Sequence, residues 1–385
     1  MRVLQFGRFW NDQHGGIERH VALLSRELAA RGVDVVNLVA SESLQGSDTT
    51  VDGYRVVQAP SCGRAFSTAI SPALVFKALG LNREKKFDIV HVHLPDPLSH
   101  LACLMLPVDI KRVITWHSDI VRQKRLLVPY LPFLKRLVRQ ADALVAATQA
   151  HYTSSIQIPP TLPLDRRHVI PYGLDFSTLK LTPGTNLLCA QIKAKAAGRP
   201  LIFALGRHVY YKGFGILIKA MRQIDALLVL GGDGPLRAEL EALAMQEGVA
   251  SSVWFTGRIP EQDLPAYFNT CDLFCLPSVA QSEAFGLVQL EAMACGKPVV
   301  CTQLHNGVNV VNVHGETGLA VPPGDNAALA VAINKLIADR PLRERLGHNA
   351  RQRANTVYSL QSMGRRHLDL YQNLLSCSTK AMTIR

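Results

Sequence analysis

The chain has 385 residues, of which 48% are hydrophobic and 19% are charged, which excludes a disordered protein and allows two domains with full cores. The formal net charge of +12 indicates an anionic partner: nucleic acid, a membrane surface or a phosphorylated substrate. The eight cysteines are scattered without C-x-x-C spacing, so they indicate neither a disulfide framework nor a zinc site.

Short apolar runs alternate with helical patterns along the chain, as in parallel sheets that are covered on both faces. The runs lie at residues 1–7, 35–39, 89–93, 143–147, 201–205 and 226–230. The pattern pauses after about Leu174 and restarts near Arg199. We therefore predict an α/β protein with two doubly wound domains, residues 1–175 and 176–356, and a ligand cleft at the carboxyl ends of the strands.

The first apolar run ends at Arg8, so it lacks the long apolar core of a secretory signal. No run is long enough to span a bilayer. The expected compartment is the cytoplasm.

Two glycines, Gly15 and Gly16, follow the first predicted strand, where a strand-to-helix turn without side chains lets a phosphate or sugar approach the backbone. An ordinary turn uses the same residues. The spacing is not the G-x-G-x-x-G of a dinucleotide site.

His91, His93 and His117 lie at or just beyond predicted strands, so their rings are candidates to face the ligand. A metal site is one interpretation, but no third ligand has a fixed helical spacing and no D-x-D element is present to hold magnesium. Buried, hydrogen-bonded histidines are the alternative.

Residues 122–139 mix basic with apolar and aromatic side chains. Such a segment is able to lie on an anionic membrane surface. A solvated helix with a core-facing stripe fits the pattern nearly as well.

The second predicted domain begins with a strand and a loop that carries Arg207 and Lys212, a spacing that suits a diphosphate. Two later strands end in the glycine turns around Gly231 and Gly257, which either line a nucleotide pocket or simply require glycine.

Glu283 precedes a predicted helix from about Gly286 to Cys295, and Glu291 lies inside that helix on the side of Leu287 and Val288. First-turn amides and the helix dipole form an anion site, which Gly286 lets a phosphate approach. Two isolated carboxylates on an ordinary amphipathic helix would look similar.

The segment from Ser282 to Val300 resembles the E-x7-E signature of the retaining glycosyltransferases of family GT-4, which have the two-domain GT-B fold. Residues 207–213 resemble the R-x4-K-G element of the same family, and residues 14–19 and 115–119 resemble its glycine loop and histidine strand. Residues 276–283 and 307–318 look most like bacterial mannosyl- or rhamnosyltransferases of lipopolysaccharide O-chain assembly. Val310 departs from that pattern, because an aromatic residue is expected there.

The resemblance implies a role for individual residues. Glu283 and His117 would hold the sugar, and Arg207 and Lys212 would stabilise the leaving diphosphate. The implied donor-binding residues are Gly15, Gly16, Gly231, Arg258, Ile259, Phe285, Gly286, Leu287, Val288 and Glu291. No metal or other cofactor is expected, and a last helix at 357–385 is expected to return to the first domain.

The sequence thus predicts a glycosyltransferase that moves a hexose, with mannose or D-rhamnose favoured, from a nucleotide-diphosphate sugar to a lipid-linked or growing surface polysaccharide. A GDP-sugar is favoured and a UDP-sugar is the alternative. Two different functions are less favoured: a sugar-nucleotide epimerase of the same fold, and a non-catalytic protein that binds nucleic acid. The basic residues are not interleaved with a stacking platform, so no nucleic-acid partner is expected.

Overall fold

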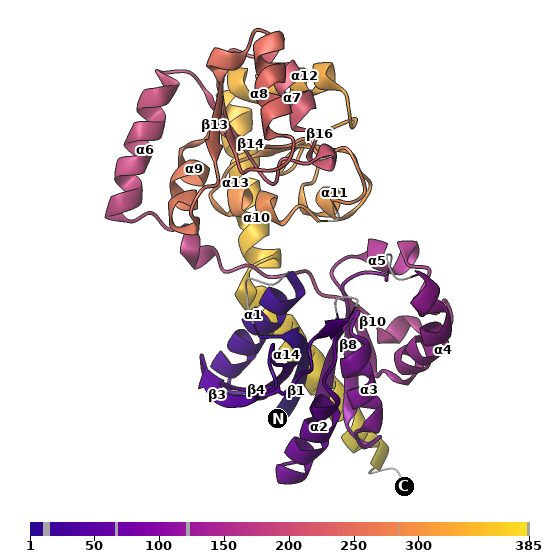
Figure 1. The fold of residues 1–385 in the computed structure, drawn as a ribbon. Helices are drawn as coiled ribbons and strands as arrows, with labels where there is room; N and C mark the ends of the chain where they lie inside the picture. The colour runs from indigo at the N-terminus through magenta and orange to yellow at the C-terminus, as the bar shows by residue number, and fades with distance from the viewer. Residues whose placement is uncertain (11–15, 66–67, 121–123, 284, 383–385) are drawn as a thin grey trace. The chain divides into compact units, whose positions relative to one another are not determined.

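The computed structural model describes residues 1–10, 16–65, 68–120, 124–283 and 285–382. The chain divides into two compact units (Figure 1): unit 1 comprises Met1–Gly173 and Leu360–Arg385, and unit 2 comprises Leu174–Ser359. The boundaries predicted from the sequence, 175/176 and 356/357, differ from these by two and three residues. Each unit is described by itself.

Unit 1 contains an eight-stranded sheet in the order β10-β9-β8-β7-β1-β2-β4-β3. The neighbouring strands are parallel except for the β3–β4 pair at one edge. The strands are β1 (Arg2–Phe9), β2 (Asp34–Ala40), β3 (Ser47–Val51), β4 (Tyr54–Ala59), β7 (Ile89–Leu94), β8 (Lys111–Trp116), β9 (Ala143–Ala146) and β10 (Arg167–Val169), and a separate ribbon pairs β5 (Arg64–Ala65) with β6 (Thr68–Ala69). The central strands are almost entirely buried, which explains their continuous apolar runs.

Two cores cover the faces of this sheet. Residues of α2 (Pro72–Glu84), α3 (Pro97–Met105) and α4 (Lys124–Gln140) contribute to one core. Residues of α1 (Gly16–Ala30) and α14 (Leu360–Met382) contribute to the other. The short helix α5 (Gln149–Ser154) follows β9.

The last helix belongs to unit 1 and packs on α1. At Gly364, a Cβ atom would lie only 2.0 Å from Cγ of Glu27, so this close approach of α14 to α1 requires glycine. The helix begins at Leu360 rather than at the predicted 357, because Val357 is the last residue of the preceding helix, α13 (Arg340–Val357).

Unit 2 contains a six-stranded, fully parallel sheet in the order β13-β12-β11-β14-β15-β16. The strands are β11 (Leu201–Leu205), β12 (Leu227–Gly231), β13 (Val253–Gly257), β14 (Leu273–Leu276), β15 (Val299–Thr302) and β16 (Gly318–Val321). The helices are α6 (Pro183–Ala196), α7 (Phe214–Ala220), α8 (Arg237–Gln246), α9 (Leu264–Thr270), α10 (Leu287–Ala294), α11 (Gly307–Val311), α12 (Asn326–Ala338) and α13. The direction of strand addition reverses between β11 and β14, and ligands of doubly wound sheets bind at such a switch point.

No helix in the described part of the chain is both long and apolar enough to cross a membrane.

Candidate active site

The loops after β11 and β14 pack backbone against backbone at the switch point of unit 2. Gly213 has φ +68°, and a Cβ atom there would lie 2.0 Å from the carbonyl oxygen of Pro277. The amide of Val279 donates to the carbonyl of Tyr211 at 2.8 Å. This packing brings the end of the first loop, with Lys212, against the second loop, with Glu283.

Lys212 and Glu283 form an ion pair, with Nζ 2.5 Å from Oε2. Their side chains are only 12% and 11% exposed. The hydroxyl of Ser278 donates to the same carboxylate oxygen at 3.1 Å, and the amide of Asn306 donates to the Glu283 carbonyl at 2.8 Å. The structure therefore brings together two residues that the sequence analysis singled out separately.

Arg207 lies with Lys212 in the loop after β11, but its side chain is exposed and forms no ion pair with another described residue. Its guanidinium is therefore available to an anion from solution. Arg207 and Lys212 thus differ in setting, since one cation is solvated and the other is held by a carboxylate.

Helix α10 begins at Leu287, and the residue before it, Gly286, has φ +64° and offers no side chain to cap the first-turn amides. Leu287, Val288 and Glu291 form its exposed and half-buried side, whereas Gln289, Leu290, Ala292 and Met293 are buried. Glu291 thus lies on the face predicted from its spacing. Phe285 was also predicted to bind the donor. Its side chain is buried, and its ring lies edge-on to Tyr358.

Gly231, Arg258 and Ile259 lie at the ends of β12 and β13. A Cβ atom on Gly231 would lie 2.8 Å from Cδ1 of Ile259, so a larger residue here would require the Ile259 side chain to shift. The amide of Gly232 donates to the carbonyl of Gly257 at 2.8 Å and ties the two turns together. Arg258 is exposed and Ile259 half-buried.

In unit 1, His117 follows β8 and lies in a chain of hydrogen bonds. Its Nε2 is 3.1 Å from Nδ1 of His93, and its Nδ1 is 3.0 Å from the hydroxyl of Tyr172. Burial, followed by the positive charge of Arg8, lowers the pKa of His117 to about 3. The ring is therefore neutral near pH 7, with both nitrogens already paired inside the unit.

The other predicted residues of unit 1 are His91, Gly15 and Gly16. His91 bonds to Tyr371 of α14 and to Thr115, so it joins the last helix to the sheet. Gly16 begins α1, and a Cβ atom there would meet nothing within 4 Å. Gly15 lies outside the described residues.

His20 on α1 was missed by the sequence analysis. Its ring centroid lies 5.0 Å from that of His117 and 5.4 Å from that of His93. The available signal was its position in the stripe that includes Leu24 and Leu28, where a polar residue at four-residue spacing faces the core.

Comparison with known proteins identifies the family. Residues 14–178 match the family described as "Glycosyltransferase Family 4", and residues 190–353 match "Glycosyl transferases group 1". The chain is 30% identical to the O-antigen chain mannosyltransferase C of Escherichia coli, over 97% of this chain and 99% of the relative. It belongs to glycosyltransferase family 4.

A second relative agrees with this assignment, and a solved structure matches the fold. The D-rhamnosyltransferase WbpZ of Pseudomonas aeruginosa is 33% identical, over 93% of the transferase and 92% of the relative. The crystal structure of Anabaena HepE in complex with UDP matches with a TM-score of 0.74 at 22% identity, and covers 97% of this chain and 100% of that one. The predicted GT-B fold of two Rossmann-like domains is confirmed.

The segment 122–139 of the transferase is largely helical, although residues 122 and 123 lie outside the described part. In α4, Leu134, Leu137 and Val138 are buried, so a core-facing stripe is present. Val128 and Phe133 are 73% and 59% exposed. Leu101 and Met105 of the neighbouring α3 are exposed as well.

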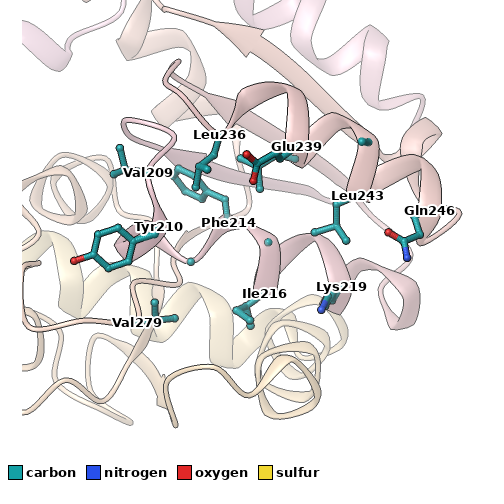
Figure 2. A pocket seen from close by; sticks show the side chains of 14 residues that line it. Val209, Tyr210, Phe214, Ile216, Lys219, Leu236, Glu239, Leu243, Gln246 and Val279 are labelled. Carbon is teal, nitrogen blue, oxygen red and sulfur yellow. The ribbon is translucent and has the colours of Figure 1, made fainter.

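A cavity of about 580 Å³ lies in unit 2 beside α7 and α8 (Figure 2). Its lining is mainly apolar and includes Val209, Phe214, Leu236, Leu243 and Val279. None of the predicted site residues lines it. The cavity is therefore separate from the residues that the family resemblance assigns to the donor.

Proposed function

We propose that this family 4 enzyme is a retaining, metal-independent hexosyltransferase of lipopolysaccharide O-antigen assembly. The donor is a GDP-sugar, with mannose or D-rhamnose as the hexose, and the acceptor is a lipid-linked or growing polysaccharide. The observation that carries the proposal is the Lys212–Glu283 ion pair beside the start of α10, at the switch point of unit 2. The relatives named for mannosyl and D-rhamnosyl transfer support this donor class.

The leaving diphosphate would be stabilised by fixed charges. Lys212 supplies an ammonium already held in place, Arg207 supplies a solvated guanidinium, and α10 supplies an uncapped helix start at Gly286. Cations and helix amides that are fixed before the reaction stabilise developing negative charge without reorganisation. This is the physical reason for proposing that no metal is needed on the diphosphate.

Glu283 would hold the sugar hydroxyls, since its carboxylate is fixed by Lys212 and Ser278. Glu291, on the open side of α10, would accept hydrogen bonds from the ribose. His117 would hold the sugar from unit 1. We assign no enzymic nucleophile: the acceptor oxygen would enter on the face that the diphosphate leaves, and a phosphate oxygen would take its proton.

The acceptor side of the proposal includes a membrane. The exposed apolar side chains of α4 and α3, together with Arg136 and Arg139, fit an anionic lipid surface such as the inner face of the plasma membrane. A lipid-linked acceptor would then be reached from that surface.

The donor assignment is tested by the melting temperature of the purified enzyme in chelator, with GDP-mannose, GDP-rhamnose, UDP-glucose or UDP-N-acetylglucosamine. A ligand at 100 times its Kd stabilises the folded state by about 2.7 kcal/mol. A rise with the GDP-sugars alone is expected. A rise with a UDP-sugar alone would replace the donor, and no rise with any of them would contradict the proposed function.

Transfer itself is tested with labelled GDP-mannose and membranes that carry lipid-linked saccharides, again in chelator. Label in the lipid-linked product is expected. Epimerised free sugar nucleotide without acceptor would instead favour the epimerase.

A further inference from the structure

Three histidines in unit 1 present ring nitrogens to one another. They are His20 on α1, His93 near the end of β7 and His117 just after β8. One nitrogen of each lies within 4.8 Å of the others. Their segments are distant in the sequence and meet because β1, β7 and β8 are adjacent parallel strands whose carboxyl ends share an edge.

We propose that His20, His93 and His117 form a binding site for one borderline divalent metal ion, for which Zn²⁺ is the reference. Three imidazoles suit zinc and its neighbours in the transition series rather than magnesium or calcium, which prefer oxygen ligands. The proposed metal ion supplies no step of the transfer.

The nitrogens of His93 and His117 already have the spacing of a ligand pair. Nδ1 of His93 and Nε2 of His117 are 3.1 Å apart. Two nitrogens at about 2.0–2.1 Å from a tetrahedral zinc ion are about 3.3 Å apart. A metal ion between them thus needs only a small adjustment of the rings.

His20 supplies the third nitrogen and the independent evidence. His20 is only 7% exposed, and its Nε2 has no hydrogen-bond partner among the described residues. A buried polar nitrogen without a partner is costly. A metal ion shared with His93 and His117 would satisfy it.

The outer nitrogens of the two paired rings have the supporting contacts typical of metal ligands. Nε2 of His93 donates to Oε1 of Gln5 at 2.8 Å, which leaves a lone pair on Nδ1. Nδ1 of His117 faces the hydroxyl of Tyr172, which is able either to donate or to accept. In the metal-free site Nε2 of His117 donates to the unprotonated Nδ1 of His93. Metal binding would move the proton of His117 to Nδ1, where the hydroxyl of Tyr172 accepts it, and so free Nε2 for the metal.

Metal binding is measured on the full chain after chelator treatment, by titration with Co²⁺ as a spectroscopic substitute for zinc. The expected result is the visible absorption of tetrahedral cobalt at one ion per chain, lost on addition of Zn²⁺. His20→Gln should abolish that absorption. Tyr172→Phe should keep the spectrum and weaken binding about 10–100-fold. His348→Ala, which removes an exposed histidine of α13, should change nothing.

Three results would overturn the proposal: no tetrahedral spectrum in the wild type, an unchanged spectrum in His20→Gln, or loss of binding in His348→Ala. Melting temperatures without metal establish that each variant is folded, and Tyr172→Phe gives a second reading if His20→Gln is not.

A consequence follows that rests on the proposed function. Zinc on Nε2 of His117 would keep that nitrogen from the donor sugar, so Zn²⁺ should lower the transfer rate of the wild type. At the same Zn²⁺ concentration, the transfer rate of Tyr172→Phe should decrease much less. The cobalt titration does not depend on transfer, so a wrong donor assignment and a wrong metal site give different results.

Discussion

The ammonium of Lys212 lies 2.5 Å from the carboxylate of Glu283, and this contact joins the loops that follow β11 and β14. Because both side chains are largely buried, removal of either leaves the other charge without its partner. A diphosphate that reaches Lys212 must share the ammonium with Glu283. Substitutions that retain shape are therefore better tests of function here than truncations.

Lys212→Met should lower kcat/KM about 10²–10³-fold, the usual effect of losing one fixed group that stabilises transition-state charge. Initial rates of sugar transfer measure this effect. The matched control is Lys219→Met, which removes an exposed cation from the neighbouring helix α7. Equal losses in both variants would indicate a general effect of charge and contradict the assigned role.

Glu283→Gln should retain the hydrogen-bonding shape while it removes the negative charge. We expect kcat to fall more than the affinity for free GDP, because the carboxylate is assigned to the sugar and not to the nucleotide. Calorimetric titration with GDP and steady-state kinetics separate these quantities. Wild-type turnover would refute the assignment, and Glu316→Gln, at an exposed site, is the control.

Glu291→Ala should weaken GDP binding about 10–100-fold, because a hydrogen bond to a charged group contributes about 1.5–3 kcal/mol. The sharper measurement compares GDP with 2′,3′-dideoxy-GDP. The wild type should discriminate between them, and the variant should bind both equally weakly. Unchanged discrimination in the variant would place the ribose elsewhere.

The strands and the face of Glu291 were predictable because they depend on local patterns. Continuous apolar runs marked β1, β7, β11 and β12, and four-residue spacing placed Glu291 beside Leu287. The Lys212–Glu283 pair was not predictable from spacing, since it depends on β11 and β14 being neighbours in the sheet. The contacts of His20 were not predictable for a similar reason: His20 lies on α1, whereas its partners His93 and His117 lie on β7 and just after β8.

The boundary between α13 and α14 shows another limit of sequence patterns. No glycine or proline marks the interruption at Tyr358 and Ser359. It coincides with a tertiary contact instead, in which the amide of Leu174 donates to the carbonyl of Tyr358 and Leu174 pairs with Ser359. A helical pattern alone therefore extended the last helix to Val357.

The stability of unit 1 should decrease as the pH is lowered, in part because of His100, a buried residue of α3. Burial lowers the pKa of His100 to about 4, whereas an unfolded histidine has a pKa near 6.5. Below pH 6.5 the unfolded chain therefore binds a proton that the folded chain does not bind. The free energy of unfolding then decreases as the pH falls toward 4. From pH 7 to pH 5 the contribution of His100 to this loss is about 2 kcal/mol, and the other buried histidines of unit 1, whose pKa values burial also lowers, add losses of the same sign.

The measurement is denaturant unfolding of the wild type and of His100→Gln at both pH values. The variant should lose about 2 kcal/mol less than the wild type over this interval. Parallel pH dependence in the two proteins would show that the pKa of His100 is the same in the folded and unfolded chains, which contradicts the prediction.

Phe133→Ser should weaken binding to vesicles that contain anionic lipid. A partly buried phenylalanine contributes about 1 kcal/mol to such binding, so the partition coefficient should fall about fivefold. Val331→Ser is the matched control, because Val331 is a similarly exposed apolar residue on α12 of unit 2. Co-sedimentation at low and high salt separates the apolar from the electrostatic contribution, since screening weakens only the latter. If the wild type does not bind, or if Phe133→Ser and Val331→Ser bind alike, α4 is a solvated helix whose stripe of Leu134, Leu137 and Val138 serves the core alone.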